Sequence, residues 1–383
     1  MTLTNQIFDI YIDLNITLGL AVVLWVIAKH IGSRLGLKLA FPVQLSLLNT
    51  VLVLVFLSPL GVLAFAHLHS EGAVPAYMAV NLSDYAVSQY LRGGIALPAE
   101  EFQSLLGFRA WLTESIVTAA PGIGLGIAAA FAASVAFGIG KLFLSLTRLR
   151  RLLAESHHWR SHGRLVLKLS DTVATPFSAR GIFKNYVVVP TEMLASPEDV
   201  KMVLKHEYQH IRQGDLVWEM VLEIVRPLFF WNPAFFYWKQ EVETIRELAC
   251  DQAVAERRGV DLKSYCMCLL RAAEFGVRRR QEQLGGKRVA IATVALLDVH
   301  KRLFRKSPAN KLRSRVEALL ETRSLRPHWS VLALVVLPVA GVILMAGVAL
   351  QKPADWSQDR LMLSAIINLE RLETINTLAQ RPD

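Results

Sequence analysis

Long apolar runs alternate with charged segments along this chain. Four runs reach the roughly 20 residues that a helix needs to cross a bilayer, and they cover about 10–28, 42–66, 116–140 and 329–350. The first run carries Asp13 near its start, but neither a basic n-region nor a small-residue cleavage site is present to make it a removable signal peptide. The pattern predicts a multi-pass α-helical membrane protein with four transmembrane helices.

Basic residues flank these runs on alternate sides, which predicts the orientation of the chain. They lie between the first two runs and just after the third: Lys29, Arg34, Lys38, Lys141, Arg148, Arg150 and Arg151. Because Lys and Arg are enriched on the cytoplasmic side of membrane proteins, both segments are expected inside the cell. By alternation, the N-terminus, an acidic outer loop at 68–112 and the C-terminus are expected outside.

This orientation divides the chain into three transmembrane helices, a cytoplasmic domain large enough for its own core, a fourth helix and a short outer tail. Their bounds are 1–145, 146–328, 329–350 and 351–383. Gly122, Gly124 and Gly126 form a GxGxG pattern in the third run, where close helix packing is favoured over a dinucleotide-binding loop. The basic stretch Arg278–Arg288 is expected to form an exposed loop.

The composition supports a membrane protein and narrows its partners. With 53% hydrophobic and 19% charged residues, the chain is too apolar for a soluble enzyme or a disordered protein. The net charge of +10 is accounted for by the flanks of the apolar runs, so direct binding to nucleic acid is not expected. Three cysteines in a cytoplasmic domain are expected to be reduced thiols.

A zinc-binding pattern lies within the predicted cytoplasmic domain. His206, Glu207 and His210 form an HExxH motif in a predicted helix that starts after Pro197. Residues four apart share one helix face, so both imidazoles can bind one zinc ion at about 2.1 Å. Glu207 is then suited to take a proton from a water that zinc activates. The motif predicts a zinc hydrolase, although HExxH also occurs by chance on charged helices.

A third ligand must come from outside the motif. Gly214 and Asp215 stand where a metzincin would need a further His, so a carboxylate from another helix is expected. Glu247, in the helical pattern 241–251, is our choice. Asp251 follows it by one turn and, like Asp215, is a candidate to accept the N–H of a ligand histidine and fix its tautomer. A simple ion pair of Asp251 with an arginine remains open.

Other residues of metal-binding type are weaker candidates. Cys250 stands between Glu247 and Asp251, where packing of a small side chain against the HExxH helix is favoured over a ligand role. Cys266 and Cys268 form C-x-C without a second pair and are expected in the core. The three histidines in 157–162 lie in a basic stretch with a tryptophan, which favours the membrane interface.

Several segments together resemble one known family. In chain order they are Thr175-Pro176-Phe177-Ser178, Gly181-Ile182-Phe183, Val187-Val188-Val189-Pro190, His206-Glu207-x-x-His210 with Asp215, Trp231-Asn232-Pro233, Glu247-x-x-Cys250-Asp251 and Lys311-Leu312-Arg313-Ser314-Arg315-Val316. Their order and spacing look like the BlaR/MecR-type antirepressor metallopeptidases, which are integral membrane zinc proteases related in motif to CAAX-processing and heat-shock membrane proteases. The resemblance covers roughly residues 1–350.

The resemblance implies an inserted α+β zinc metallopeptidase domain of gluzincin-like type. It implies one Zn²⁺ ion per chain, held by His206, His210 and Glu247, with Glu207 as catalytic base. In the antibiotic-sensing members a penicillin-binding domain with an S-x-x-K serine follows the last span. Here about 33 residues follow and none forms that motif, so acylation by a β-lactam is not expected.

Candidate substrate-binding residues lie on both sides of the motif. Val187, Val188 and Val189 are expected in an edge strand to which an extended substrate could add by main-chain hydrogen bonds. An ordinary core strand is the open alternative. Arg313 and Arg315 are speculative candidates for stabilising the oxyanion.

These observations predict a bacterial inner-membrane zinc endopeptidase with its active site on the cytoplasmic side. The resemblance suggests a transcriptional repressor as the substrate, or the chain itself around Arg278–Arg288, in signal-responsive regulation. Two alternatives remain open: a constitutive quality-control or processing protease, and a non-proteolytic signal receptor with a structural zinc site. The expected partners are a protein substrate and the lipid bilayer, and a homodimer is left open.

Overall fold

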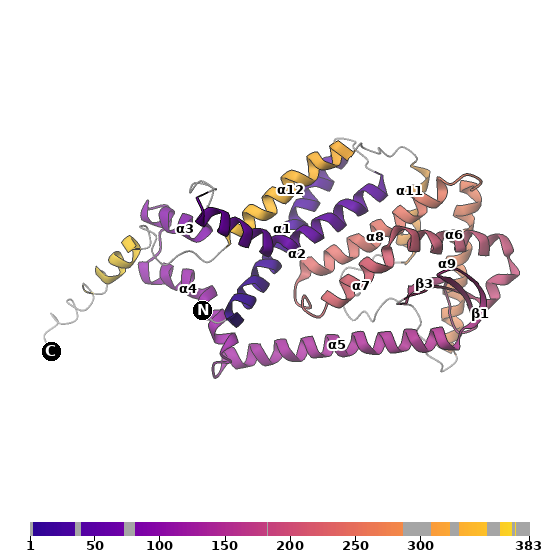
Figure 1. Cartoon of the computed structure of the whole chain (residues 1–383), viewed down its shortest axis with the longest axis horizontal. Coiled ribbons are helices and arrows are strands. Elements are labelled where there is room, and N and C mark those ends of the chain that lie inside the picture. The colour runs from indigo at the N-terminus through magenta and orange to yellow at the C-terminus, as the bar shows by residue number, and fades with distance from the viewer. Residues whose placement is uncertain are drawn as a thin grey trace. The chain divides into compact units, whose positions relative to one another are not determined.

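The computed structural model describes residues 3–34, 40–72, 81–181, 183–285, 308–321, 329–350, 361–369 and 372. In this part of the chain the protein is mostly helical, with one small sheet (Figure 1). Two compact units are present, and each is described by itself. Unit 1 comprises residues 1–25, 50–132 and 333–383, and unit 2 comprises 26–49 and 133–332.

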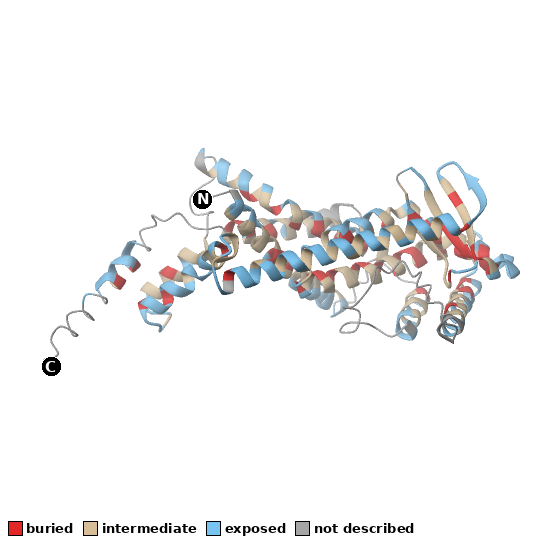
Figure 2. Ribbon diagram, turned by 90° about the horizontal axis from the view of Figure 1, so that it is seen from below, coloured by how far each residue is buried: buried red, intermediate tan, exposed pale blue. Residues whose placement is uncertain are grey.

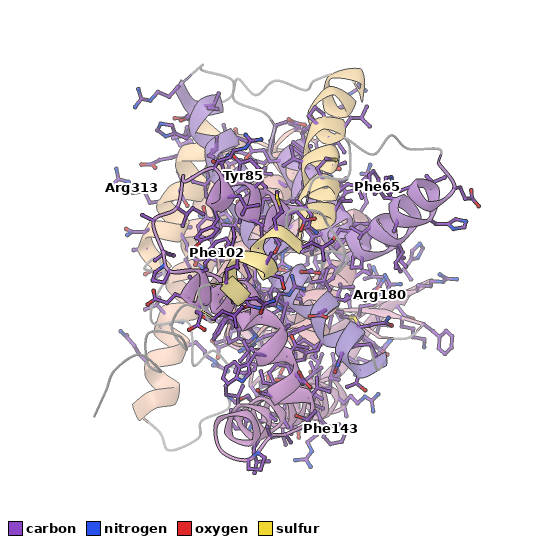
Figure 3. All side chains as sticks on the ribbon, turned by 90° about the vertical axis from the view of Figure 1, so that its left-hand side faces the viewer. Phe65, Tyr85, Phe102, Phe143, Arg180 and Arg313 are labelled. Atoms are coloured by element: carbon purple, nitrogen blue, oxygen red, sulfur yellow. The ribbon has the colours of Figure 1, made fainter. Side chains whose placement is uncertain are left out.

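Three helices are long and apolar enough to cross a membrane. They are α1 (Leu3–Arg34), α2 (Phe41–Ser70) and α5 (Ile123–Glu155). The helix α12 (Trp329–Ala349) coincides with the fourth predicted span, and its fully described apolar part is shorter. Side chains along α5, the long helix nearest the viewer in Figure 2, are exposed or only partly buried, and Phe143 points outward in Figure 3. Exposed apolar side chains on such a helix are suited to contact with lipid.

The third predicted span, 116–140, is wrong at its beginning. The chain makes a turn at 118–122 before α5 starts. Ala119 and Gly122 have left-handed backbone conformations there, with φ of 48° and 95°. Because Pro121 also lacks an N–H and disfavours a helical conformation in the residue before it, one continuous helix cannot pass through this turn. α5 instead extends beyond the predicted end of the span.

The GxGxG pattern contributes one close contact. A Cβ on Gly124 would lie 2.3 Å from the main-chain oxygen of Ser115, so only glycine allows this approach between the two backbones. Gly122 is required by its positive φ, and neither it nor Gly126 has another described atom close to the position of a Cβ. The predicted close packing therefore holds for Gly124 alone.

Unit 1 contains a small helical cluster in the predicted outer loop. The helices α3 (Leu82–Leu91) and α4 (Ala99–Val117) pack with a helix at 361–369. The buried residues of this cluster are Val87, Ala99, Phe102, Leu363 and Ile367. The apolar positions of the C-terminal segment thus pack against the predicted outer loop. Residues 351–360 of the predicted tail lie outside the described residues.

Unit 2 is built on a four-stranded mixed sheet. Its strands are β1 (His157–His162), β2 (Leu165–Ser170), β3 (Phe177–Arg180) and β4 (Asn185–Pro190), and their order is β1-β2-β4-β3. β4 pairs parallel with β2 and antiparallel with β3. The predicted edge strand is therefore wrong: Val187, Val188 and Val189 lie in an interior strand and are almost fully buried. β3 forms the edge on this side.

Besides parts of α1, α2, α5 and α12 and the 3₁₀ helix η2 (Thr191–Ala195), five α-helices lie among the described residues of unit 2. They are α6 (Pro197–Gln213), α7 (Asp215–Val225), α8 (Pro233–Ala255), α9 (Leu262–Gly285) and α11 (Pro308–Leu320). α6 packs against β3, β4, α7, α8 and α9, so it is the central helix of the unit. The predicted exposed loop Arg278–Arg288 is wrong over most of its length, because α9 continues to Gly285. Residues 286–288 lie outside the described part.

Candidate metal centre

The ends of α6 fix the face on which the two histidines lie. Pro197 occupies the first turn, where its missing N–H has no cost, and Glu198 and Asp199 there complement the helix dipole. The helix ends at Gly214, whose φ of 76° suits glycine and turns the chain directly into α7. The local sequence thus sets both ends of the helix that carries the HExxH motif, and its start at Pro197 agrees with the prediction.

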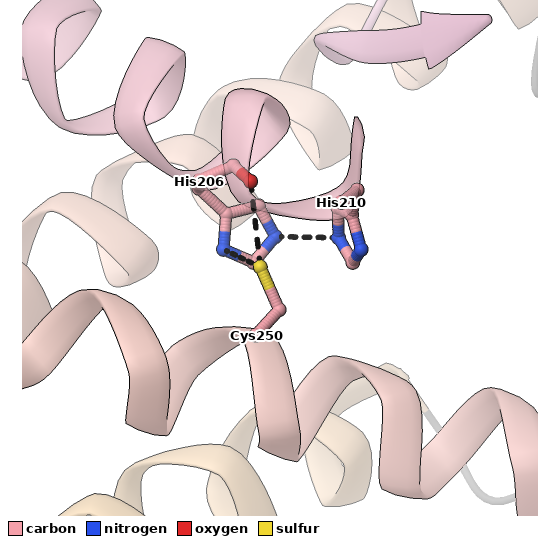
Figure 4. Close-up of side chains that lie close together, drawn as sticks. All are labelled: His206, His210 and Cys250. Carbon is pink, nitrogen blue, oxygen red and sulfur yellow. Dashed lines mark hydrogen bonds between the residues drawn. The ribbon is translucent and has the colours of Figure 1, made fainter. Parts of the chain in front are cut away.

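The two imidazoles of α6 approach each other through one nitrogen each. Nε2 of His206 lies 3.2 Å from Nε2 of His210, and the rings are perpendicular (Figure 4). If both nitrogens carried lone pairs, they would repel at this distance unless a proton or a cation lay between them. Two ligands of one tetrahedral zinc ion lie about 3.3 Å apart, given bonds of 2.0–2.1 Å. The histidine pair therefore fits a shared metal ion.

The opposite nitrogen of each ring is held by neighbouring side chains. Nδ1 of His210 lies 2.8 Å from Oδ2 of Asp215. Nδ1 of His206 lies 2.9 Å from the hydroxyl of Tyr265 and 3.3 Å from Oδ1 of Asp251, and Tyr265 donates a hydrogen bond of 2.8 Å to the same oxygen. An N–H at each Nδ1 leaves each Nε2 with a lone pair for a metal. The structure therefore brings both candidate supporting carboxylates to the histidines.

Glu247 faces the free nitrogens of the histidine pair. Its carboxylate oxygens lie 3.8 Å from Nε2 of His206 and 3.7 Å from Nε2 of His210. Burial alone raises the pKa of this carboxyl, but the positive charges of Arg315, His210 and His206 outweigh it and lower the pKa to about 2. Glu247 is thus an anion over the whole physiological pH range and completes a donor set of two imidazoles and one carboxylate.

Cys250 is a second possible donor close to the same histidines. Its sulfur and the two imidazoles lie near enough together to hold a metal (Figure 4). The thiol, however, donates to the main-chain oxygen of His206 at 3.3 Å and lies 3.5 Å from Nδ1, the nitrogen that faces away from His210. Its side chain is fully buried. This position favours packing of Cys250 against the HExxH helix, as predicted, over a role as a metal ligand.

A cavity of about 570 Å³ opens beside the histidines. His206, Glu207, His210 and Glu247 line it, whereas Cys250 is not among its lining residues. A catalytic zinc site needs three protein ligands and one open position. His206, His210 and Glu247 would supply three ligands, and the candidate base Glu207 lines the same cavity. The residues present therefore fit a catalytic metal site.

Arg313 and Arg315, the candidates for stabilising the oxyanion, lie in different positions. Arg313 is not among the residues that line the cavity: its side chain is 77% exposed, points away from the protein in Figure 3 and pairs with Glu317. Arg315 does line the cavity, but its guanidinium is engaged by Asp251 through two hydrogen bonds of 2.6 and 2.7 Å. The structure therefore brings Arg315, but not Arg313, to the cavity.

Sequence reasoning also missed residues of the site. Thr175, Pro176, Phe177 and Ser178, at the edge strand β3, line the cavity, and so does Tyr265. The uninterrupted valines of β4 were a signal for an interior strand, which would have moved the predicted edge to β3. Tyr265 had no local signal. The histidines of β1 are exposed and do not line the cavity.

Comparison with known proteins decides the family. Residues 45–322, well over half of the chain, match the family described as BlaR1 peptidase M56. The chain belongs to the BlaR1 peptidase M56 family. This family is one of peptidases, in agreement with the metal-binding geometry of the described residues, and three described helices are long and apolar enough to cross a membrane.

Individual relatives of this family match a shorter region. The Regulatory protein BlaR1 of Bacillus licheniformis is 25% identical over 138 residues, which is 35% of this chain and 23% of that protein. The Methicillin resistance mecR1 proteins of Staphylococcus aureus and Staphylococcus epidermidis are 23% identical over 109 residues, 28% of this chain and 18% of theirs. The match thus spans less than a quarter of the length of these relatives.

Proposed function

We propose that this chain is a zinc-dependent endopeptidase of the bacterial inner membrane that cleaves a cytoplasmic protein in response to a signal. The observation that carries the proposal is the convergence of two imidazole nitrogens, the Glu247 carboxylate and Glu207 on one cavity that is bordered by an edge strand. In this proposal the protease domain, 146–328, lies in the cytoplasm, between the third and the last of four transmembrane helices, and both termini lie outside.

The ligands in this proposal are His206, His210 and Glu247, which hold one zinc ion per chain. When bound, zinc supplies Lewis-acid chemistry, because it polarises a peptide carbonyl and lowers the pKa of a water. Asp215 and Asp251, with Tyr265, keep the two imidazoles in the tautomer that presents Nε2 to the metal.

Glu207 acts as the general base in this mechanism. Its side chain is buried, with 8% exposure, and lines the cavity next to the ligand His206. The carboxylate accepts the proton of the attacking water and then donates it to the leaving amine, so that no separate acid is required. General acid–base catalysis of this kind contributes about 10²- to 10⁴-fold to a rate.

The edge strand β3 offers a surface for an extended substrate. β3 pairs with β4 on one side, and no described strand pairs with its other side. Phe177 and Ser178 belong to β3 and line the cavity, so a peptide that adds to this edge runs beside the metal ligands. Main-chain hydrogen bonds would supply affinity with little demand on substrate sequence.

The substrate in this proposal is a transcriptional repressor or the chain itself. The support is indirect: the chain belongs to a peptidase family named after BlaR1, and a relative from Bacillus licheniformis is called a regulatory protein. A constitutive processing protease would share the chemistry but would cleave many proteins without a signal. A receptor with a structural metal site would bind zinc and cleave none.

The test is a comparison of host membranes that contain the wild type or Glu207→Gln. Mass spectrometry would identify new protein termini, in this chain and in cytoplasmic proteins, and metal analysis of the purified proteins would give zinc per chain. We expect equal zinc in both, with products only in the wild type and on few proteins. Products that persist with Glu207→Gln would contradict the base assignment, and equal zinc without any products would favour the receptor.

A further inference from the structure

Arg315 is far from the HExxH motif in the sequence but contacts Glu247 and Asp251 in the structure. It lies on α11, which packs against α8 and α9. Leu319, one turn later on the same face, is buried in a cluster with Cys250, Val254 and Tyr265. This apolar contact fixes the rotation of α11 and directs Arg315 toward the metal ligands.

The guanidinium of Arg315 binds two carboxylates at once. Nε and an Nη donate to Asp251 at 2.6 and 2.7 Å, and another Nη lies 3.3 Å from Oε2 of Glu247. Because Glu247 and Asp251 are one turn apart on α8, a single planar guanidinium holds both of them in a fixed geometry. A lysine ammonium, which is a point charge, cannot reproduce this geometry.

Both of these carboxylates contact the histidine pair. Oε2 of Glu247, the oxygen that faces Arg315, is also the one 3.8 Å from Nε2 of His206, and Oδ1 of Asp251 lies 3.3 Å from Nδ1 of the same ring. We propose that Arg315 is a positioning residue of the metal site, which holds the ligand Glu247 and the supporting Asp251 in register with His206. This inference rests on the proposed function, since it presumes a metal on these ligands.

Electrostatics and geometry predict opposite effects for the loss of Arg315. If its charge were all that mattered, its removal would leave the carboxylates less neutralised and would strengthen the binding of a cation. If it acts by positioning, its removal lets the Glu247 side chain move away, and the metal is held less firmly. The rate of metal release therefore separates the two roles.

The experiment uses the full-length protein, purified and loaded with zinc or cobalt. Arg315→Met and Arg315→Lys are compared with the wild type and with Arg313→Met, a matched control on the same helix whose side chain is exposed and pairs only with Glu317 among the described contacts. The readouts are zinc release to a chelator, the visible spectrum of bound Co²⁺ and thermal unfolding.

We expect both Arg315 variants to release zinc about 10- to 100-fold faster, as is typical when a group that orients a ligand is lost, with an altered Co²⁺ spectrum. Arg313→Met should behave as the wild type. Unchanged release and spectrum in both Arg315 variants, or full rescue by lysine, would overturn the proposal. Lower thermal stability with unchanged metal release would also overturn it, because it would show a merely structural role.

A second comparison covers the case in which Arg315→Met does not fold because Asp251 is left buried without its cation. The double variant Arg315→Met with Asp251→Asn removes that charge and is compared with Asp251→Asn alone. We expect faster zinc release from the double variant, because Glu247 still lacks its partner, and equal release would overturn the proposal. A wild type that binds neither metal would instead refute the proposed function itself.

Discussion

One face of α8 carries two pairs of charged residues, Lys239 with Glu243 and Glu247 with Asp251, whose charged partners come from different places. Lys239 and Glu243 are one turn apart and form an ion pair of 2.6 Å, and Lys239 also lies 2.9 Å from the buried Glu223 of α7. Glu247 and Asp251 continue the same face one turn at a time. The groups that face these two acids are imidazoles of α6 and the guanidinium of Arg315 on α11.

The two pairs differ in whether their charges are neutralised within the helix or by residues of other helices. In the first half, the cation and the acid that neutralise each other are neighbours on one helix, so their interaction needs little from the rest of the fold. In the second half, Glu247 and Asp251 contact side chains of other helices. Nε2 of His206 and Nε2 of His210 lie 3.8 and 3.7 Å from the carboxylate of Glu247. Charged residues at equal spacing thus form an ion pair at one end of the face and, in the proposed function, a metal site at the other.

The largest effect on zinc affinity and cleavage is expected from Glu247→Ala. It removes one of three proposed ligands, so zinc affinity and cleavage should fall by more than the roughly 10- to 100-fold seen when only an outer partner is lost. Glu243→Ala, one turn earlier on the same face, is the matched control and should keep its zinc. Metal analysis and a cleavage assay measure both, and a loss of zinc in the control instead would reverse the assignment.

A smaller effect is expected from Asp215→Asn. The substitution keeps the shape of the side chain but removes the charge that orients Nδ1 of His210 at 2.8 Å. Affinity for zinc should decrease about 10- to 100-fold, as measured by competition with a chelator, and the protein should remain folded. An unchanged affinity would mean that Asp215 only joins α6 to α7.

The smallest effect on the metal is expected from Lys239→Met. The variant loses the ion pairs with both Glu223 and Glu243. Glu223 would keep Arg226, 3.2 Å away, as a partner, and Glu243 is partly exposed, so the free energy of unfolding should fall by about 1.5–3 kcal/mol, the range for a charged hydrogen bond. Zinc content should not change. Denaturant unfolding and metal analysis of the same samples measure both quantities, and a loss of zinc would show that the two halves of the α8 face are coupled.

The sequence was sufficient for the parts of the site that depend on local periodicity. His206 and His210, and likewise Glu247 and Asp251, are four residues apart on helices, so each pair necessarily shares a face. Pro197 located the start of the helix that carries the motif. The first two membrane helices followed from length and apolar composition in the same way.

The parts that failed depend on contacts between distant segments. The order of strands, which makes β3 rather than β4 the edge, follows from tertiary packing and not from the residues of either strand alone. Tyr265 reaches His206 from α9, and no spacing in the sequence relates it to the motif. Arg315 was a candidate from the sequence, but its contacts with Glu247 and Asp251 follow from the packing of α11. The start of α5 was misplaced because the apolar composition continues through the turn at 118–122.

The most direct test of the metal centre is X-ray absorption at the zinc edge of the purified, zinc-loaded protein. We expect nitrogen and oxygen neighbours at about 2.0–2.1 Å, which come from His206, His210, Glu247 and one exchangeable ligand. A sulfur neighbour at about 2.3 Å would contradict this expectation, because Cys250 would then replace Glu247 as a ligand.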